Sequence, residues 1–310
     1  MKSRVAAEGL TIVLVVLSWV PLAAQDVGPQ WPAAPRERGV ISEGRSVSPF
    51  FEGWYENPDG TFTLSFGYFN RNTEEAVNLP VGPDNFIAPA DYDGVQPTLF
   101  TPGRETGVFT VTVPGNFARN GGRVVWTLRS RARSPHSVPG KVGVEAYRLH
   151  YGPTAMGSLP PMLKLHRDGP ELWGPMTIAG DARLVSARSG SEVWRPAGSV
   201  GNPLALAASV GTPVTLTVWV TDRLDPDAER DPLRGGARWY THQGPALALF
   251  SEERPEPDEE AGNRATTTVT FSEPGEYVLR VRADNFNPID SMPARQCCWT
   301  NGYVRVTVSR

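Results

Sequence analysis

Residues 61–68 read Thr-Phe-Thr-Leu-Ser-Phe-Gly-Tyr, and this stretch decides the class of the fold. Bulky apolar residues occupy every second position of the run: Phe62, Leu64, Phe66 and Tyr68. A period of two is typical of a β-strand that buries one face. A strong turn signal, Asn-Pro-Asp-Gly at residues 57–60, separates this run from the aromatic residues 50–55. Residues 50–68 therefore predict a β-hairpin.

The same alternation returns further along the first half of the chain. It predicts three more strands, carried by Phe109, Val111 and Val113, by Val124, Trp126 and Leu128, and by Val142, Val144 and Ala146. Short alternating strands with turns between them are typical of a sandwich or barrel. The sequence shows no sustained helical period with caps, so we do not expect a parallel α/β architecture.

The second half also predicts strands with one inward face. Their inward residues are Val214, Leu216, Val218 and Val220, then Val269 and Phe271, then Tyr277, Leu279, Val281 and Ala283, and finally Val304, Val306 and Val308. We therefore expect an all-β protein of antiparallel sheets.

Residues 273–281 carry a family resemblance. They read Glu-Pro-Gly-Glu-Tyr-Val-Leu-Arg-Val, which resembles the turn and penultimate strand of immunoglobulin-like and PKD-type modules of bacterial surface proteins. The resemblance implies that the Tyr277 hydroxyl bonds back to the chain as a tyrosine corner, that Trp239 is a core residue of an earlier strand, and that residues 303–308 form the closing strand. The Trp-Asp-Phe-Gly-Asp-Gly segment of PKD modules is absent, so the broader immunoglobulin-like class applies.

The first half resembles a group of uncharacterised exported bacterial proteins. The resemblance rests on Phe-Glu-Gly-Trp-Tyr-Glu-Asn-Pro-Asp-Gly at residues 51–60 and Phe-Gly-Tyr-Phe-Asn-Arg-Asn at residues 66–72. It implies no activity.

The 310 residues are enough for two domains. We expect β-sandwich domains at residues 47–152 and 176–310, the second immunoglobulin-like. Pro and Gly crowd residues 153–175, which predicts a linker between them.

The N-terminus predicts export. Residues 1–24 combine Lys2 and Arg4 with an apolar run and the small-residue ending Ala23-Ala24, the pattern of a signal peptide. The polar residues 25–46 predict a disordered leader. The apolar run is short for a spanning helix, so we expect no membrane insertion after cleavage and a periplasmic or extracellular location.

Composition gives little support to a nucleic-acid partner. Thirty Lys and Arg oppose 33 Asp and Glu, a net charge of -3, so no global basic field exists. An envelope protein or a glycan is the partner we expect.

Cys297 and Cys298 are the only cysteines, and they are adjacent. They predict a vicinal disulfide, a pairing with another chain, or free thiols, and the sequence leaves these three alternatives open.

An acidic loop is a candidate calcium site because hard cations prefer clustered oxygen ligands. Its carboxylates are Asp222, Asp225, Asp227, Glu229 and Asp231. Arg223 and Arg230 partly neutralise it, so a solvated loop is the competing interpretation. We expect no other cofactor.

No catalytic residues are assigned. The four histidines, His136, His150, His166 and His242, lie far apart, and no Gly-x-Ser-x-Gly elbow accompanies them. The expected function is non-catalytic binding, adhesion or envelope association. One alternative is carbohydrate binding through a cluster of first-module aromatics: Trp54, Tyr55, Tyr68 and Phe69. A hydrolase with an unrecognised site is the second alternative.

Overall fold

A computed structural model describes residues 43–57, 59–130, 134–149, 157–174, 176–178, 184–186, 204–228, 231, 235–285 and 298–310. The predicted signal peptide and nearly all of the predicted leader lie outside this part of the chain. Within the described residues, no helix is both long and apolar enough to cross a membrane.

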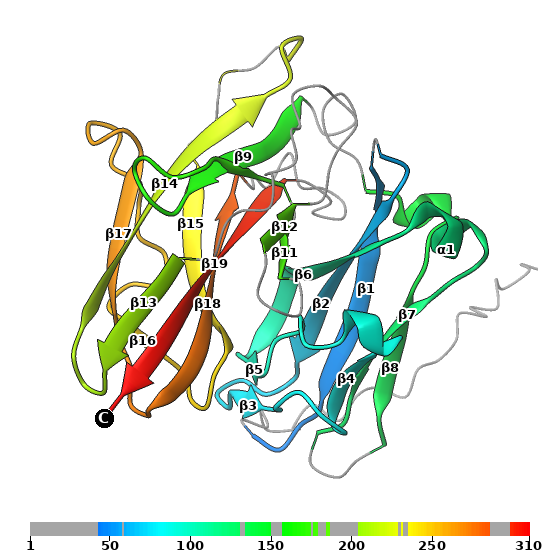
Figure 1. Ribbon diagram of the computed structural model, residues 1–310, viewed down its shortest axis with the longest axis horizontal. Helices are drawn as coiled ribbons and strands as arrows, with labels where there is room; N and C mark the ends of the chain where they lie inside the picture. The colour runs from blue at the N-terminus through cyan, green and yellow to red at the C-terminus, as the bar shows by residue number, and fades with distance from the viewer. Residues whose placement is uncertain are drawn as a thin grey trace, which may run out of the picture. The chain divides into compact units, whose positions relative to one another are not determined.

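The protein is all-β, as the alternation predicts, with antiparallel pairing in nearly every sheet (Figure 1). The strands of the first module are β1 (Val47–Glu56), β2 (Phe62–Asn70), β3 (Val77–Asn78), β4 (Asn85–Ala88), β5 (Leu99–Phe100), β6 (Gly103–Val113), β7 (Val124–Leu128) and β8 (His136–Gly140). They form sheets of order β1-β2-β6, β4-β7-β8 and β3-β5. The helices of this module are short: η1 (Ala90–Tyr92), α1 (Gly115–Arg119) and η2 (Glu145–Tyr147).

The predicted hairpin is confirmed as the antiparallel pair β1–β2. The strand predicted at residues 142–146 is wrong: β8 ends before it, and the chain turns through Gly143 at φ +95° into η2. Glycine accepts this left-handed conformation without steric cost, so the alternating valines on either side of it do not lie in one extended strand.

An aromatic core fills the first module. The Phe66 and Phe109 rings stack with centroids 5.2 Å apart, and Trp126 meets Phe109 edge-on at 4.9 Å. The Trp126 Nε1–H donates to Asn85 Oδ1 at 3.1 Å, while the Asn85 amide donates to the Leu79 and Pro97 carbonyls. Every polar group of this buried asparagine is therefore satisfied, so its burial is not penalised.

The second module consists of two sheets with a shared core (Figure 1). One sheet has the order β10-β9-β14-β17-β16 and the other β13-β19-β18-β15. The strands are β9 (Ser158–Lys164), β10 (Leu172–Trp173), β13 (Leu204–Ser209), β14 (Val214–Leu224), β15 (Gly236–Gln243), β16 (Leu249–Phe250), β17 (Arg264–Thr270), β18 (Gly275–Asp284) and β19 (Trp299–Ser309). A separate hairpin joins β11 (Met176–Ile178) to β12 (Leu184–Ser186).

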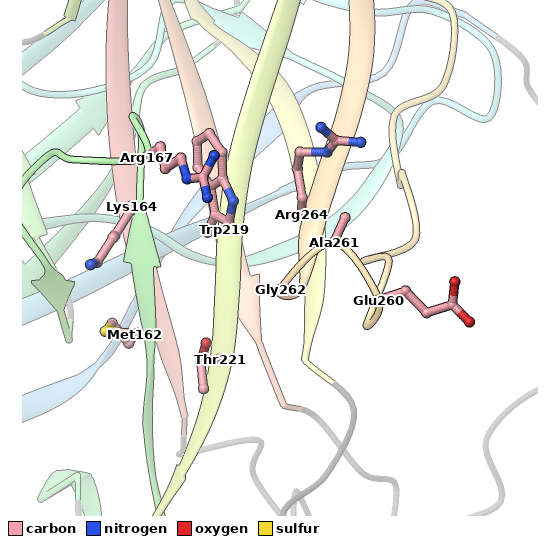
Figure 2. Close-up of a pocket in the computed structure, with 9 residues that line it drawn as sticks. All are labelled: Met162, Lys164, Arg167, Trp219, Thr221, Glu260, Ala261, Gly262 and Arg264. Carbon is pink, nitrogen blue, oxygen red and sulfur yellow. The ribbon is translucent and has the colours of Figure 1, made fainter.

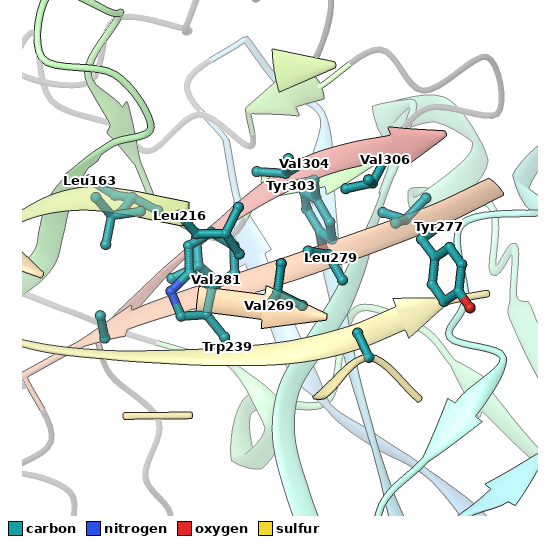
Figure 3. Close-up of a cluster of buried hydrophobic side chains, with 14 of the residues drawn as sticks. Leu163, Leu216, Trp239, Val269, Tyr277, Leu279, Val281, Tyr303, Val304 and Val306 are labelled. Atoms are coloured by element: carbon teal, nitrogen blue, oxygen red, sulfur yellow. The ribbon is translucent and has the colours of Figure 1, made fainter. Parts of the chain in front are cut away.

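This topology is that of an immunoglobulin-like sandwich. Strand β13 runs parallel to the last strand β19, while β18 pairs antiparallel with both β19 and β15. The tyrosine corner is confirmed: the Tyr277 hydroxyl donates to the Glu273 carbonyl at 3.0 Å. Figure 3 shows Trp239 in the same core as Tyr277, Leu279 and Val281, and its exposed fraction is 1%.

Residues 153–175, predicted as a linker, contain β9 and β10. Strand β9 includes Pro160 and Pro161, which are normally found at sheet edges or bulges because proline lacks a backbone N–H. The β9–β14 register shifts between Thr221 and Arg223, opposite these prolines, so their missing donors fall at an irregularity. The boundaries of the two domains stay predictions.

The two modules are in contact within the compact unit Val40–Arg310. The Gly107 carbonyl of β6 accepts hydrogen bonds from Arg280 Nη1 and Asn301 Nδ2, both at 2.9 Å. Glu105, also on β6, pairs with Arg238 of β15 at 2.9 Å. The outer face of β15–β18–β19 is therefore covered by the first module of the same chain.

Candidate functional site

The predicted cluster of first-module aromatics does not form an exposed face. Trp54, Tyr55 and Tyr68 are buried, with exposed fractions of 5%, 5% and 3%, and only the Phe69 ring is exposed. Trp54 Nε1–H donates to the Val144 carbonyl, and the Tyr68 hydroxyl contacts Thr101 Oγ1 at 3.0 Å. Three of the four rings are thus unable to stack on a sugar in this conformation.

Tyr55 shows why alternation alone does not determine which of these rings are exposed. The Tyr55 and Trp299 ring centroids lie 6.4 Å apart, and the two residues share a small buried cluster with Leu149. Alternation assigns one face of β1 to the core and leaves the other to solvent. Here Trp299, from the last strand of the chain, covers the second face.

Two of the described carboxylates of the acidic loop accept hydrogen bonds from the protein. Asp222 Oδ1 accepts from Asn285 Nδ2 at 2.6 Å, and Asp225 Oδ1 accepts from the Asp227 backbone N–H at 3.1 Å. Asp231 lies on the surface, and Glu229 lies outside the described residues. Across the described ranges, no three His, Cys, Asp or Glu side chains converge as metal ligands. The calcium site stays a prediction.

Cys298 is disulfide-bonded and buried, with its sulfur 3.4 Å from the Ser158 carbonyl oxygen. Cys297, the only other cysteine in the sequence, lies outside the described residues.

The histidines do not gather. His166 is exposed on a loop, His242 is buried against the first module, and His150 lies outside the described residues. His136 Nδ1 lies 3.0 Å from Ser48 Oγ, a pair that sequence reasoning missed because the two residues are on different strands. In the part of the chain that the structure describes, no carboxylate bonds to His136 to orient it as a catalytic base requires.

A groove on the outer face of β9–β14–β17 is the feature that sequence reasoning did not find. Its volume is about 510 Å³, and Figure 2 shows the residues that line it. Trp219 lies near its centre, half-buried, on the outward side of β14. The inward neighbours Val218 and Val220 are buried in the core, so alternation along β14 directs the indole away from it.

Register places two cations beside this indole. Trp219 is the cross-strand partner of Lys164 on β9 and of Arg264 on β17, so the three form one row across the sheet. The next row pairs Thr221 with Met162. We call the five outward residues of these two rows the Trp219 face: Met162, Lys164, Trp219, Thr221 and Arg264.

The groove is positively charged. Arg167 joins Lys164 and Arg264 in its lining, and the lining contains one carboxylate, Glu260. Figure 2 shows the Glu260 side chain pointing away from Trp219. Lys164 Nζ lies 3.4 Å from Glu171, a partly exposed pair of the kind that contributes little to stability. Among the described residues, neither Arg167 nor Arg264 has an ion-pair partner.

A second polar cluster lies at the contact between the modules and is closed. Tyr68, Tyr240, His242 and Arg280 border a cavity of about 10 Å³, roughly the volume that one water molecule requires. The Arg280 guanidinium lies 4.0 Å from the Tyr240 ring centroid. This cluster holds the modules together and has no room for a larger ligand.

No protein-family model matches the chain, and no curated protein matches it. Among solved structures, the S-layer protein SbsC domains 4 and 5 are 10% identical, with 61% of this chain and 66% of that chain covered and a TM-score of 0.23. The D0-D1 domain of intimin is 14% identical, with coverages of 85% and 95% and a TM-score of 0.21. The fibronectin(III)-like modules of Clostridium thermocellum CbhA are 11% identical, with coverages of 84% and 94% and a TM-score of 0.21. Likenesses this weak carry no conclusion about function.

Proposed function

We propose that the chain is an exported, non-catalytic binding protein, and that the Trp219 face is its recognition surface for a saccharide. The observation that carries this proposal is the half-buried Trp219 within a groove of about 510 Å³. Export is part of the proposal and rests on the signal-peptide pattern of residues 1–24.

A tryptophan on the outer face of a sheet gains less from burial than one in the core. Trp239 is enclosed by the sandwich, whereas Trp219 is only half-buried and lies among Thr, Lys and Arg side chains. An aromatic ring with one accessible face is a suitable platform for the apolar face of a pyranose ring. A binding role accounts for an aromatic residue at a position where the fold does not require one.

The surroundings of Trp219 also suit a saccharide. Thr215, Thr217 and Thr221 follow the same outward side of β14, and Thr266 continues this side on β17. Thr217 Oγ1 and Thr266 Oγ1 lie 3.4 Å apart. Hydroxyl groups of this kind both donate and accept hydrogen bonds, which matches the hydroxyl groups of a sugar. The face thus combines one stacking ring with a polar surround, the usual composition of small-ligand sites.

The test is a pull-down against the cell-envelope fraction of the source organism, with calcium present and with a chelator. The protein is the full chain, expressed with its own predicted signal peptide and purified after export. The matched variants are Trp219→Ala at the half-buried ring and Phe69→Ala at an exposed ring, and captured material is identified by glycan analysis and mass spectrometry.

The proposal predicts a saturable glycan partner that Trp219→Ala loses and Phe69→Ala retains. Loss on Phe69→Ala with retention on Trp219→Ala would overturn it in favour of a site on the first module. Equal capture by both variants would also contradict it. Calcium dependence of the captured partner would instead locate recognition near the loop of Asp222 and Asp225.

A further inference from the structure

We propose that the ligand of the Trp219 face is an acidic polysaccharide, with a sugar ring over Trp219 and its anionic groups held by Lys164, Arg264 and Arg167. This inference rests on the proposed function and adds the chemical class of the ligand.

The row Lys164–Trp219–Arg264 has the geometry for such a ligand. The three residues are direct cross-strand partners on adjacent strands. Because neighbouring strands lie about 4.8 Å apart, the row spans roughly 10 Å. A sugar ring above the central indole therefore has a cation within reach on either side, and a carboxylate on that ring or the next one meets Lys164 or Arg264.

The charge of the groove is opposite to that of the chain. The whole sequence has an excess of acidic residues, with a net charge of -3, whereas three cations and one carboxylate line the groove. Charge-assisted hydrogen bonds from guanidinium to carboxylate are stronger than neutral ones and often bidentate. The Arg167 and Arg264 guanidinium groups are therefore suited to acidic sugars, and an uncharged glycan leaves them unused.

Among the described residues, Lys164 is the one cation of the row with an ion-pair partner, and that partner is the carboxylate of Glu171. Glu171 is 45% exposed at 3.4 Å from Lys164 Nζ. An exposed pair of this kind is weak and exchanges readily with an anion from solution. The pair with Glu171 therefore shows that Lys164 binds a carboxylate at this position.

The opposite sheet of the same module shows how the chain satisfies a similar arrangement. Arg238 lies with its guanidinium carbon 4.8 Å from the Tyr240 ring centroid, and Glu105 of the first module meets it at 2.9 Å. There a ring with adjacent cations is completed by a carboxylate of the same chain. On the Trp219 face, the corresponding acid would come from the ligand.

A nucleic acid is the other polyanion that could occupy such a groove. Among the described residues that line the groove, Trp219 is the one aromatic ring, whereas single-stranded nucleic acids are bound along several stacking rings in a basic channel. This difference favours a polysaccharide, and nucleic acid becomes an outcome of the test.

The test compares polygalacturonate with its fully methyl-esterified form, which has the same backbone without the charges. Hyaluronate and single-stranded DNA are the other probes, and affinity is measured by calorimetry on the exported full chain. The variant is Arg264→Gln, and its matched control is Arg305→Gln, which removes an exposed arginine from β19. Both substitutions replace an exposed arginine on a strand with an uncharged polar residue. Thermal unfolding verifies that each variant folds.

We expect the acidic polymers to bind at least about tenfold more tightly than the ester, and added salt to reduce this difference. Arg264→Gln lowers affinity for polygalacturonate by about tenfold and leaves binding of the ester unchanged, since one charge-assisted contact is lost. Arg305→Gln alters neither.

Equal binding of acid and ester, both lost on Trp219→Ala, would overturn the inference and leave the proposed saccharide-binding function standing. Preference for single-stranded DNA, or a Trp219-dependent envelope glycan without acidic groups, would likewise overturn the inference alone. Absence of binding to every polymer, together with an envelope capture indifferent to Trp219→Ala, would overturn the proposed function itself.

Discussion

The two outer faces of the second module carry related rows of side chains, but one row is buried and the other is open. On one face, register aligns Tyr240, Arg280 and Tyr303, a cation between two rings. On the other it aligns Lys164, Trp219 and Arg264, a ring between two cations. The first row is buried under the first module, with Arg280 2% exposed, and the second row borders an open groove. Composition alone therefore does not tell whether such a row is buried between modules or borders an open groove. The first module covers one row and leaves the other open.

Among variants at the contact between the modules, the largest effect should come from Gly107 of β6, which lies beside Trp299 of β19. A Cβ atom at this position would lie 2.5 Å from Trp299 Cε2, and the backbone has φ +60°. We expect Gly107→Ala to destabilise the protein by about 3 kcal/mol or more, from overpacking and backbone strain together. Chemical denaturation measures this loss.

Gly121→Ala is the matched control, because Gly121 has φ +79° and no atom within 4 Å of the added Cβ. It should cost only the backbone strain, about 1 kcal/mol. Equal losses in the two variants would mean that the contact with Trp299 contributes nothing.

Glu105→Gln tests the covered face by removing a negative charge from the contact between the modules. The Glu105 carboxylate lies 2.9 Å from Arg238 and 3.8 Å from Arg282, and its side chain is 6% exposed. Neutralising it leaves Arg238 and Arg282 with only their second partners, Glu253 and Asp284, at a cost of roughly 1.5–3 kcal/mol in unfolding free energy for the lost charge-assisted bond. The control is Glu56→Gln, which breaks a pair with Arg148 on the surface and should change stability by at most about 0.5 kcal/mol. A cost for Glu105→Gln no larger than this control would argue against a tight contact between the modules.

The burial of His242 predicts that the protein becomes less stable in acid. Burial, with a smaller effect from the Arg280 charge, lowers the His242 pKa from 6.5 to about 3, although its hydrogen bond to the Val95 carbonyl opposes the shift. Between these values the unfolded chain binds a proton that the folded chain does not. Stability therefore falls as pH falls, by about 1.4 kcal/mol per unit within this window, or roughly 2 kcal/mol between pH 7 and 5.

Denaturation of wild type and His242→Gln across this pH range measures the contribution of His242. Glu52, whose pKa burial raises, contributes with the opposite sign, so the difference between the two proteins is the quantity of interest. His166→Gln, on an exposed loop, is the control. An unchanged pH slope in His242→Gln would contradict the closed environment of this ring.

The smallest effect on stability should come from Trp219. Trp219→Ala should cost about 1 kcal/mol or less because the ring is only half-buried, whereas Trp239→Ala should cost about 3–5 kcal/mol. Binding should respond in the reverse order, since only Trp219 reaches the groove. A large loss of stability for Trp219→Ala, measured by the same denaturation, would indicate a packing role for this residue.

Much of the fold could be predicted because it depends on local patterns. The inward positions of β18 and the Tyr277 corner follow from alternation and a short turn signal. Strand β9 was missed because Pro160 and Pro161 argue against a strand, and only its pairing with β14 shows where they are tolerated. The burial of Trp54 and Tyr55 could not be predicted for a similar reason, because it depends on distant segments that cover them.

The Trp219 face could not be found from the sequence because its members come from three strands far apart in the chain. Alternation along β14 does place Trp219 opposite the inward Val218 and Val220, so its outward direction was accessible. The positions of Lys164 and Arg264 beside it depend on register, which local patterns do not determine.

The most direct test of the Trp219 face is hydroxyl-radical footprinting of the exported full chain, with and without saturating polygalacturonate, read residue by residue by mass spectrometry. The account predicts that the polymer protects Trp219 and Met162 from oxidation and leaves Phe69 unchanged. Protection of Phe69 with continued oxidation of Trp219, or no protection at saturation, would contradict recognition at this face.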